Sequence, residues 1–277
     1  MAISAAQVKE LRDRTGAGMM DCKKALQETE GNMEAAIDLL RSKGAAKAAK
    51  RAGREATEGV VASYVDDDAG VGALVEVNCE TDFVARNEEF QALAAELAEH
   101  VAKHEEVDGT GDGEALLEHG FMGGDRTVDQ VVTQKSAKTG EKVVVRNFAR
   151  FDSDGRLGAY VHMGGKIGVL VELDPDASEE LARDVAMHIA ASRPLAVTPE
   201  ELPEDVVERE RQVYLEQVRQ EGKPENIQER IVEGKLGKFY KENALVEQPF
   251  VKDPDMTVGA LVADTKIRRF VRYELGE

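Results

Sequence analysis

A short glycine-rich stretch that contains a lysine is the first place where this sequence could do chemistry. Residues 163–168 read MGGKIG and directly follow His162. Glycine-rich loops with a lysine can hold phosphate groups, but the GxxxxGK[ST] spacing of a phosphate-binding loop is absent here. We therefore predict a hairpin turn, and we interpret His162, at the end of a strand, as a surface or hydrogen-bonded residue.

The two cysteines, Cys22 and Cys79, are candidate nucleophiles and metal ligands. A reactive cysteine needs a nearby base or cation that favours the thiolate, and neither has a recognisable base beside it in the sequence. Two cysteines cannot make a disulfide framework or a four-ligand zinc site, and no G-x-S-x-G motif occurs. We also find no histidine pair with metal-ligand spacing. We predict structural cysteines, no bound metal and no cofactor.

The segment 78–84, with the sequence NCETDFV, carries the most unusual side chains. It joins a predicted strand to a predicted helix, whereas the counterpart at 174–178 is plain and polar. Periodicity favours Phe83 in the core, with Thr81 or Asp82 capping the helix. The alternative is an exposed wedge, apolar beside acidic, that enters a crevice of a partner.

An internal repeat predicts the elements that position this segment. Tyr64-Val65 recurs as Tyr160-Val161, and a Gly-x-Leu-Val-Glu motif at 72–76 recurs at 168–172, both with an offset of 96 residues. Each copy predicts two strands joined by a turn and followed by an amphipathic helix. The result is a pair of related α+β units, each a small antiparallel sheet covered by helices.

The elements of the two copies can be assigned to residue ranges. The amphipathic helices are expected at 87–103 and 178–192, and further strands at 141–151 and 268–275, where β-branched and aromatic residues are frequent. Two helical runs, at about 204–221 and 225–243, interrupt the second copy, and their short Gly-Pro link predicts an antiparallel helical hairpin. The hairpin either projects as a binding arm or dimer contact, or packs flat on the core.

Residues 4–42 predict three short helices around a very small core. Met19 and Met20 follow a break at two glycines, and two interpretations stay open. The pair either closes this core or forms an adaptable apolar contact for a partner. Residues 43–58 are basic and contain no aromatic side chain that could stack on bases, which favours a solvated, partly helical linker over a nucleic-acid patch.

Length, composition and charge narrow the class of protein. The chain has 277 residues, of which 36 are Lys or Arg and 54 are Asp or Glu, for a formal net charge of −18. Residues 1–54 hold 11 basic and 7 acidic residues, so a basic module is attached to a body of net charge −22. Nucleic-acid binders need basic surface to neutralise phosphates, so we expect no direct contact with nucleic acid. Without an apolar run of 18 residues or a signal-peptide pattern, we expect a cytoplasmic protein with no membrane contact.

Several longer motifs resemble those of the bacterial translation elongation factor Ts family. Residues 15–26, TGAGMMDCKKAL, are similar to the opening signature of that family, and residues 77–85, VNCETDFVA, are similar to its second signature. Stretches at 187–192, 221–224 and 231–234 are similar to later parts of the family. The match runs from about Val8 to Gly276, which is essentially the whole chain.

The resemblance implies a fold and a division into domains. It implies an α+β protein with a ubiquitin-associated-like three-helix module, a duplicated core and an inserted antiparallel coiled-coil hairpin. We place the module and its basic linker at 1–54, the first core subdomain at 55–140, the second at 141–196 and 246–277, and the hairpin at 197–245.

The resemblance also implies guanine-nucleotide exchange on elongation factor Tu, an activity in which the protein makes or breaks no covalent bond. In the family, a Thr-Asp-Phe-Val corner displaces magnesium from the nucleotide site of the partner, which points here to Thr81, Asp82, Phe83 and Val84. Phe83 would wedge between helices of the partner's GTPase domain, and Asp82 would contact the same region.

Two more contact regions follow from the same resemblance. His162 would lie beside the phosphate loop of the partner. The contact surface of the N-terminal module would contain Lys9, Arg12, Met19, Met20 and Lys23.

Two other classes of function stay open. One is a non-catalytic scaffold or chaperone-like protein-binding module of the same fold. The other is a metal- or thiol-dependent enzyme that uses Cys79, Asp82 and His162, which requires these side chains to lie together. The sequence also leaves open a homodimer, or a 2:2 complex with elongation factor Tu, formed through the core or the hairpin.

Overall fold

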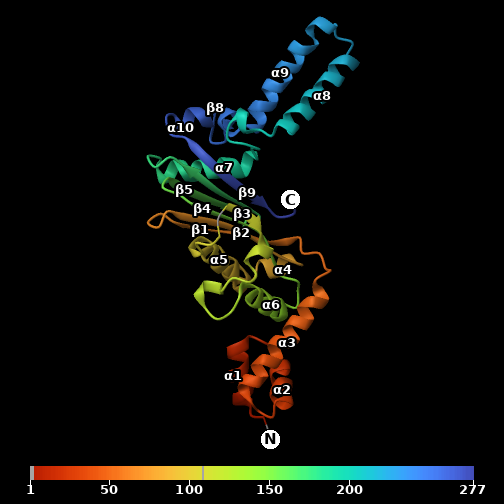
Figure 1. The fold of residues 1–277 in the computed structure, drawn as a ribbon, viewed down its shortest axis with the longest axis vertical. Helices are drawn as coiled ribbons and strands as arrows, with labels where there is room; N and C mark the ends of the chain where they lie inside the picture. Colours follow the sequence, from red (N-terminus) through yellow and green to blue (C-terminus); the bar gives the residue numbers. More distant parts are fainter. Residues whose placement is uncertain (1–2, 108) are drawn as a thin grey trace.

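The computed structural model describes residues 3–107 and 109–277. Along the longest axis of the molecule, a three-helix module lies at one end, a body with two sheets in the middle and a pair of long helices at the other end (Figure 1). Helices and antiparallel sheets are mixed along the chain, which confirms the expected α+β class. None of the described helices is both long enough and apolar enough to cross a membrane.

The N-terminal module consists of three helices. These are α1 (Ala5–Thr15), α2 (Met19–Glu28) and the first half of α3 (Met33–Arg51). Ser4 and Gln7 form a capping box at the start of α1, and Gly16 ends this helix with a φ of 66°, a conformation that glycine adopts without strain. The core is small: Val8, Leu11, Cys22, Ala25, Leu26 and Ala36.

Helix α3 is longer than the sequence predicts. The basic segment after residue 42 continues as helix to Arg51 and packs against α6 (Val128–Thr139), where Gly44 faces Ala137. Arg51 donates a hydrogen bond to the carbonyl of Ser136, and Lys43 forms an ion pair with Glu28 of α2. The expected solvated, partly helical linker is therefore helical to Arg51 and largely exposed, and it also contacts the body through α6.

The first sheet has the strand order β1-β2-β4-β3 and is antiparallel throughout. Its strands and the helices packed on it are β1 (Glu58–Asp66), β2 (Val71–Cys79), β3 (Gly109–Asp112), β4 (Val144–Asp152), α4 (Asp82–Ala85) and α5 (Glu88–Lys103). The short 3-10 turns η1 (Gly113–Leu116) and η2 (Phe121–Gly123) follow β3. Apolar residues of α5, among them Phe90, Leu93 and Leu97, fill the space between the helix and the sheet.

The second sheet repeats this plan with the order β5-β6-β9. Its elements are β5 (Arg156–His162), β6 (Ile167–Leu173), the covering helix α7 (Glu179–Ser192) and β9 (Ile267–Glu274). In both copies the third strand pairs antiparallel with the second strand of the hairpin. The strand at 144–152 therefore lies in the first sheet, whereas the predicted boundary at residue 141 assigns it to the second unit, because β-branched content identifies a strand but not its partner.

The two sheets pack face to face, with α5 outside one sheet and α7 outside the other (Figure 1). The residues between the sheets include Val61, Leu74, Phe151, Leu157 and Leu170. Every residue of β2 and of β6 is buried. Both strands lie between a helix and a second sheet, which explains their nearly continuous apolar sequences.

The remaining elements lie between α7 and β9. They are η3 (Pro199–Glu201), α8 (Glu204–Gln220), α9 (Glu225–Asn243), η4 (Leu245–Glu247), β7 (Pro249–Phe250), β8 (Asp253–Thr257) and α10 (Val258–Val262), and apolar residues from η4 onward join the core of the second sheet. Helices α8 and α9 form the predicted antiparallel hairpin, with Val218 near the tip packed against Val232. The hairpin projects away from the sheets (Figure 1), so it does not lie flat on the core.

Candidate functional site

The corner after β2 is a short helix, α4, whose position is fixed by its cap. The Thr81 hydroxyl accepts a hydrogen bond from the backbone N–H of Val84, which confirms Thr81 as the predicted helix cap. Asn87 then caps α5 by accepting from Glu89 N–H. Two caps within seven residues leave this corner little conformational freedom.

Glu141, which no sequence motif indicates, holds the corner from outside. One carboxylate oxygen accepts from the backbone N–H groups of Glu80 at 3.1 Å and Thr81 at 3.0 Å, and the other accepts from the Thr81 hydroxyl at 2.6 Å. Hydrogen bonds to a carboxylate are among the stronger ones in proteins. Glu141 lies 60 residues from Thr81 in sequence, so no local motif could reveal it.

Glu80 ties the same corner to the N-terminal module. Its carboxylate accepts from the backbone N–H of Lys142 at 2.5 Å and pairs with Arg54 at 3.2 Å. The backbone hydrogen bond from Lys142, together with Arg54, lowers the pKa of Glu80 below its ordinary value. Lys142 in turn donates from its ammonium to the carbonyl of Ala52, just after α3.

Phe83 is 82% exposed, so its predicted place in the core is wrong, and the ring is on the surface as the alternative requires. The inward side of α4 is already occupied by Ala85, which is buried, and by Val84, which packs against the first core. Phe90, fully buried, supplies one of the aromatic rings of that core. A phenyl ring held in water on a doubly capped corner is an unfavourable arrangement unless a partner covers it.

Asp82 lies beside Phe83 on the exposed side of α4. Its carboxylate forms an ion pair with Arg86 at 3.0 Å, one helical turn further on. Both partners are well exposed, and exposed pairs of this kind contribute little to stability. The carboxylate is therefore available to a partner at little cost to the fold.

His162 lies on the same edge of the body as this corner. The turn that follows His162 contacts β1, because Gly165 O accepts from Val61 N–H at 2.7 Å. The start of β1 pairs with the end of β2, Glu58 opposite Cys79, immediately before the corner. His162 itself is exposed and shares a hydrogen bond with the Tyr160 hydroxyl at 3.0 Å, as expected for a surface histidine.

The predicted contact residues of the N-terminal module are all exposed. Met19 and Met20 are 55% and 63% exposed, so the interpretation that they close the small core is wrong. They form the first turn of α2, while Cys22, Ala25 and Leu26 face the core. The exposed charged members of the set are Lys9, Arg12 and Lys23.

The structure does not bring Cys79, Asp82 and His162 together as an enzyme would need. Cys79 is fully buried and donates to the carbonyl of Thr81, Asp82 pairs with Arg86, and His162 pairs with Tyr160. Burial, together with the charge of Glu141, raises the pKa of the Cys79 thiol to about 12. A thiol with that pKa is not a thiolate nucleophile near neutral pH.

These features define an α+β protein with a duplicated core and a fixed corner that exposes an aromatic ring beside a carboxylate. The family model described as Elongation factor TS matches residues 80–277, which include Thr81–Val84 of this corner, both sheets except β1 and β2, and the helical hairpin. The chain belongs to the elongation factor Ts family.

Relatives over the full length support this assignment. The chain is 50% identical over 279 residues to Elongation factor Ts of Alkalilimnicola ehrlichii, with 100% of this chain and 93% of the relative covered. It is 46% identical over 282 residues to Elongation factor Ts of Halothermothrix orenii, again with 100% and 93% covered. It is also 46% identical over 286 residues to that of Aquifex aeolicus, with 100% and 99% covered.

Proposed function

We propose that this chain is a guanine-nucleotide exchange factor that binds elongation factor Tu·GDP, disturbs the site of Mg²⁺ and phosphate, and promotes GDP release so that GTP can bind. The observation that carries the proposal is Phe83, exposed on a corner that Thr81 and Glu141 hold in place. Family membership supports the same activity.

Exchange of this kind follows from thermodynamic linkage. Tight binding of GDP depends on Mg²⁺ that bridges protein and phosphates. A factor that binds the nucleotide-free partner more tightly than the GDP-bound partner must weaken GDP binding by the same factor. A phenyl ring inserted between packed helices shifts them, and shifts of 1–2 Å suffice because packed interfaces switch between discrete arrangements. Phe83 would supply the ring and Asp82 a charge next to it.

We assign supporting contacts to two other regions. The module predicted at residues 1–54 would act as a ubiquitin-associated-like docking module through Met19 and Met20, which can adapt to a partner surface because methionine side chains repack easily. His162 would contact the phosphate loop from the same edge as Phe83. The α8–α9 hairpin would act as a coiled-coil arm, or as the contact in a 2:2 complex.

The test is release of a fluorescent GDP analogue from purified elongation factor Tu, at a fixed Mg²⁺ concentration, with and without this protein. Acceleration by substoichiometric amounts of the protein is the expected result, because each molecule acts many times. No acceleration with folded protein and active partner would refute exchange and favour the non-catalytic scaffold of the same fold.

A further inference from the structure

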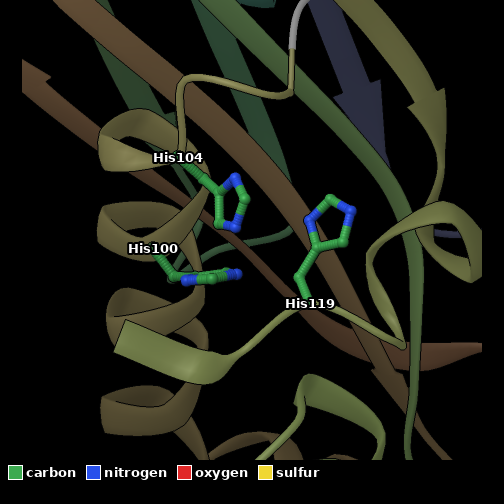
Figure 2. Close-up of side chains that lie close together, drawn as sticks. All are labelled: His100, His104 and His119. Carbon is green, nitrogen blue, oxygen red and sulfur yellow. The ribbon is translucent and has the colours of Figure 1, made fainter. Parts of the chain in front are cut away.

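Three of the five histidines of the chain meet outside the site described above. His100 lies in the last turn of α5, His104 directly follows the end of this helix, and His119 comes from the segment between η1 and η2. Figure 2 shows the three rings around a common space between the helix and that segment. One ring nitrogen from each residue lies within 4.8 Å of the other two.

Each of the three rings has a buried nitrogen without a hydrogen-bond partner. These atoms are His100 Nε2, His104 Nδ1 and His119 Nδ1. His100 is 3% exposed, and the other two side chains are half-buried. A buried polar atom that lacks a partner costs about 1–3 kcal/mol. Three such atoms in one place indicate that something absent from the protein chain itself satisfies them.

The donor set selects the chemical class of that ligand. Imidazole nitrogen suits zinc, copper and nickel ions, whereas magnesium and calcium prefer oxygen ligands. Three histidines with an open fourth position are a known coordination pattern of zinc. We propose that His100, His104 and His119 bind a Zn²⁺ ion. In the sequence, the only signal for this site is the spacing of four residues between His100 and His104 at the end of a predicted helix, and His119 could not be placed beside them from spacing alone.

The present hydrogen bond of His100 sets one requirement for coordination. The Nδ1 atom of His100 accepts from the backbone N–H of Met122 at 3.2 Å, which leaves the proton on Nε2. Coordination through Nε2 moves the proton to Nδ1 and breaks the bond to Met122. Met122 itself has a φ of 52°, which is unusual for a residue other than glycine.

The ion would cross-link two parts of the first subdomain. The ligand atoms must also move closer together, because zinc holds nitrogen at about 2.0–2.1 Å. The rings of His104 and His119 already stack with centroids 4.5 Å apart, and His100 lies 5.2 Å from His104. The segment that carries His119 has little regular structure of its own and leads into α6. A bound ion would fix this segment against α5.

The experiment measures Zn²⁺ binding to the untagged full chain by competition with a chromophoric chelator. We expect one tight site per chain, and we expect His104→Gln and His119→Gln to weaken it at least about tenfold. His162→Gln, which removes an exposed histidine elsewhere, is the matched control and should bind zinc as the unmodified chain does. Circular dichroism checks that each variant is folded.

Two further readouts separate coordination from binding to surface carboxylates. Co²⁺ in place of Zn²⁺ should give the intense visible absorption of a four-coordinate nitrogen site, and the Met122 amide should exchange with solvent faster when the metal is bound. Zinc binding that is equal in the unmodified chain and in both cluster variants would overturn the proposal. So would an unchanged Met122 amide, because His100 would then not be a ligand.

Discussion

Leu74 of the first copy packs onto Gly168 of the second, and Leu170 of the second packs onto Gly72 of the first. A Cβ atom built on Gly168 would lie 2.9 Å from Leu74 Cδ1, and one built on Gly72 would lie 3.0 Å from Leu170 Cδ1. The same Gly-x-Leu motif therefore supplies both a gap and the side chain that fills it, once in each sheet. The sequence repeat is also the contact that joins the two sheets.

Replacing Gly168 by alanine should destabilise the protein. The added methyl group would collide with Leu74 and, more closely still, with Val61, because both sit between two packed sheets. Overpacking of this kind costs about 1–3 kcal/mol of unfolding free energy. Urea unfolding of Gly168→Ala, monitored by circular dichroism, measures the loss.

Gly237→Ala is the matched control for this prediction. Gly237 lies in α9 with no atom within 4 Å of an added Cβ, so alanine should leave the unfolding free energy unchanged or raise it by up to about 1 kcal/mol through helix propensity. Equal stabilities of the two variants would mean that the sheets separate easily and that the reciprocal packing does not hold them together.

The repeat and the hairpin could be predicted from the sequence because both depend on local periodicity. The predicted helix at 87–103 is α5 at Glu88–Lys103, and the predicted hairpin turns are present. The partner of the strand at 144–152 could not be predicted, because pairing depends on which sheet edge is free in three dimensions. The packing of residues 43–51 on α6 could not be predicted either, because it depends on how these two segments are arranged in three dimensions.

The candidate site shows more clearly that sequence periodicity alone does not predict which residues are exposed for function. Sequence periodicity predicted that Phe83 lies in the core, whereas the family resemblance predicted that it contacts a partner. Only the second prediction agrees with a ring that is 82% exposed. Glu141 was missed because its role rests on contacts to Glu80 and Thr81, some 60 residues away. Residues that contact a partner, or that bond to residues distant in the sequence, cannot be recognised from the spacing of neighbouring residues.

Phe83→Ala should slow the release of GDP from elongation factor Tu while leaving the fold intact. The ring makes little contact with the rest of the chain, so the unfolding free energy should stay within about 0.5 kcal/mol. Met256→Ala, which truncates an exposed apolar side chain on β8, is the control and should not alter exchange. Exchange by Phe83→Ala at the rate of the unmodified protein would contradict the wedge.

Glu141→Gln should loosen the corner that carries Phe83. Glutamine offers one acceptor oxygen in place of two, so at least one of the three hydrogen bonds to Glu80 and Thr81 is lost. We expect a loss of about 1–2 kcal/mol in unfolding free energy and slower exchange at saturating partner. A double-mutant cycle with Phe83→Ala measures the coupling between the two residues.

The cycle separates a positioning role from a general loss of stability. If Glu141 acts by placing Phe83, then Glu141→Gln should slow exchange in the unmodified protein and have almost no further effect when residue 83 is alanine. Additive effects in the exchange assay would show that Glu141 acts on exchange by some route other than Phe83.

Replacing Met19 and Met20 by serine should weaken association with elongation factor Tu more than it slows the exchange step. Both side chains are exposed and contribute little to the module's own core, so the fold should persist. Exchange rates measured against partner concentration should show a higher half-saturation point with a similar maximum. A lower maximum with unchanged half-saturation would place these residues in the exchange step and refute a docking role.

His188 should make the stability of the protein depend on pH below neutrality. The ring is fully buried in α7, shares a 2.9 Å hydrogen bond with Gln248, and accepts from Val251 N–H at 3.1 Å. Burial lowers the pKa of His188 below its ordinary value of 6.5, so below that pH the unfolded chain binds a proton that the folded chain does not. Stability must then fall as the pH drops from about 6.5 towards the lowered folded pKa.

His188→Gln should reduce this fall in urea unfolding series at pH 7.5 and pH 5, whereas His162→Gln, at an exposed position, should not. An identical pH dependence in both variants would mean that the buried ring of His188 does not titrate on unfolding, and that other groups govern the acid sensitivity of the fold.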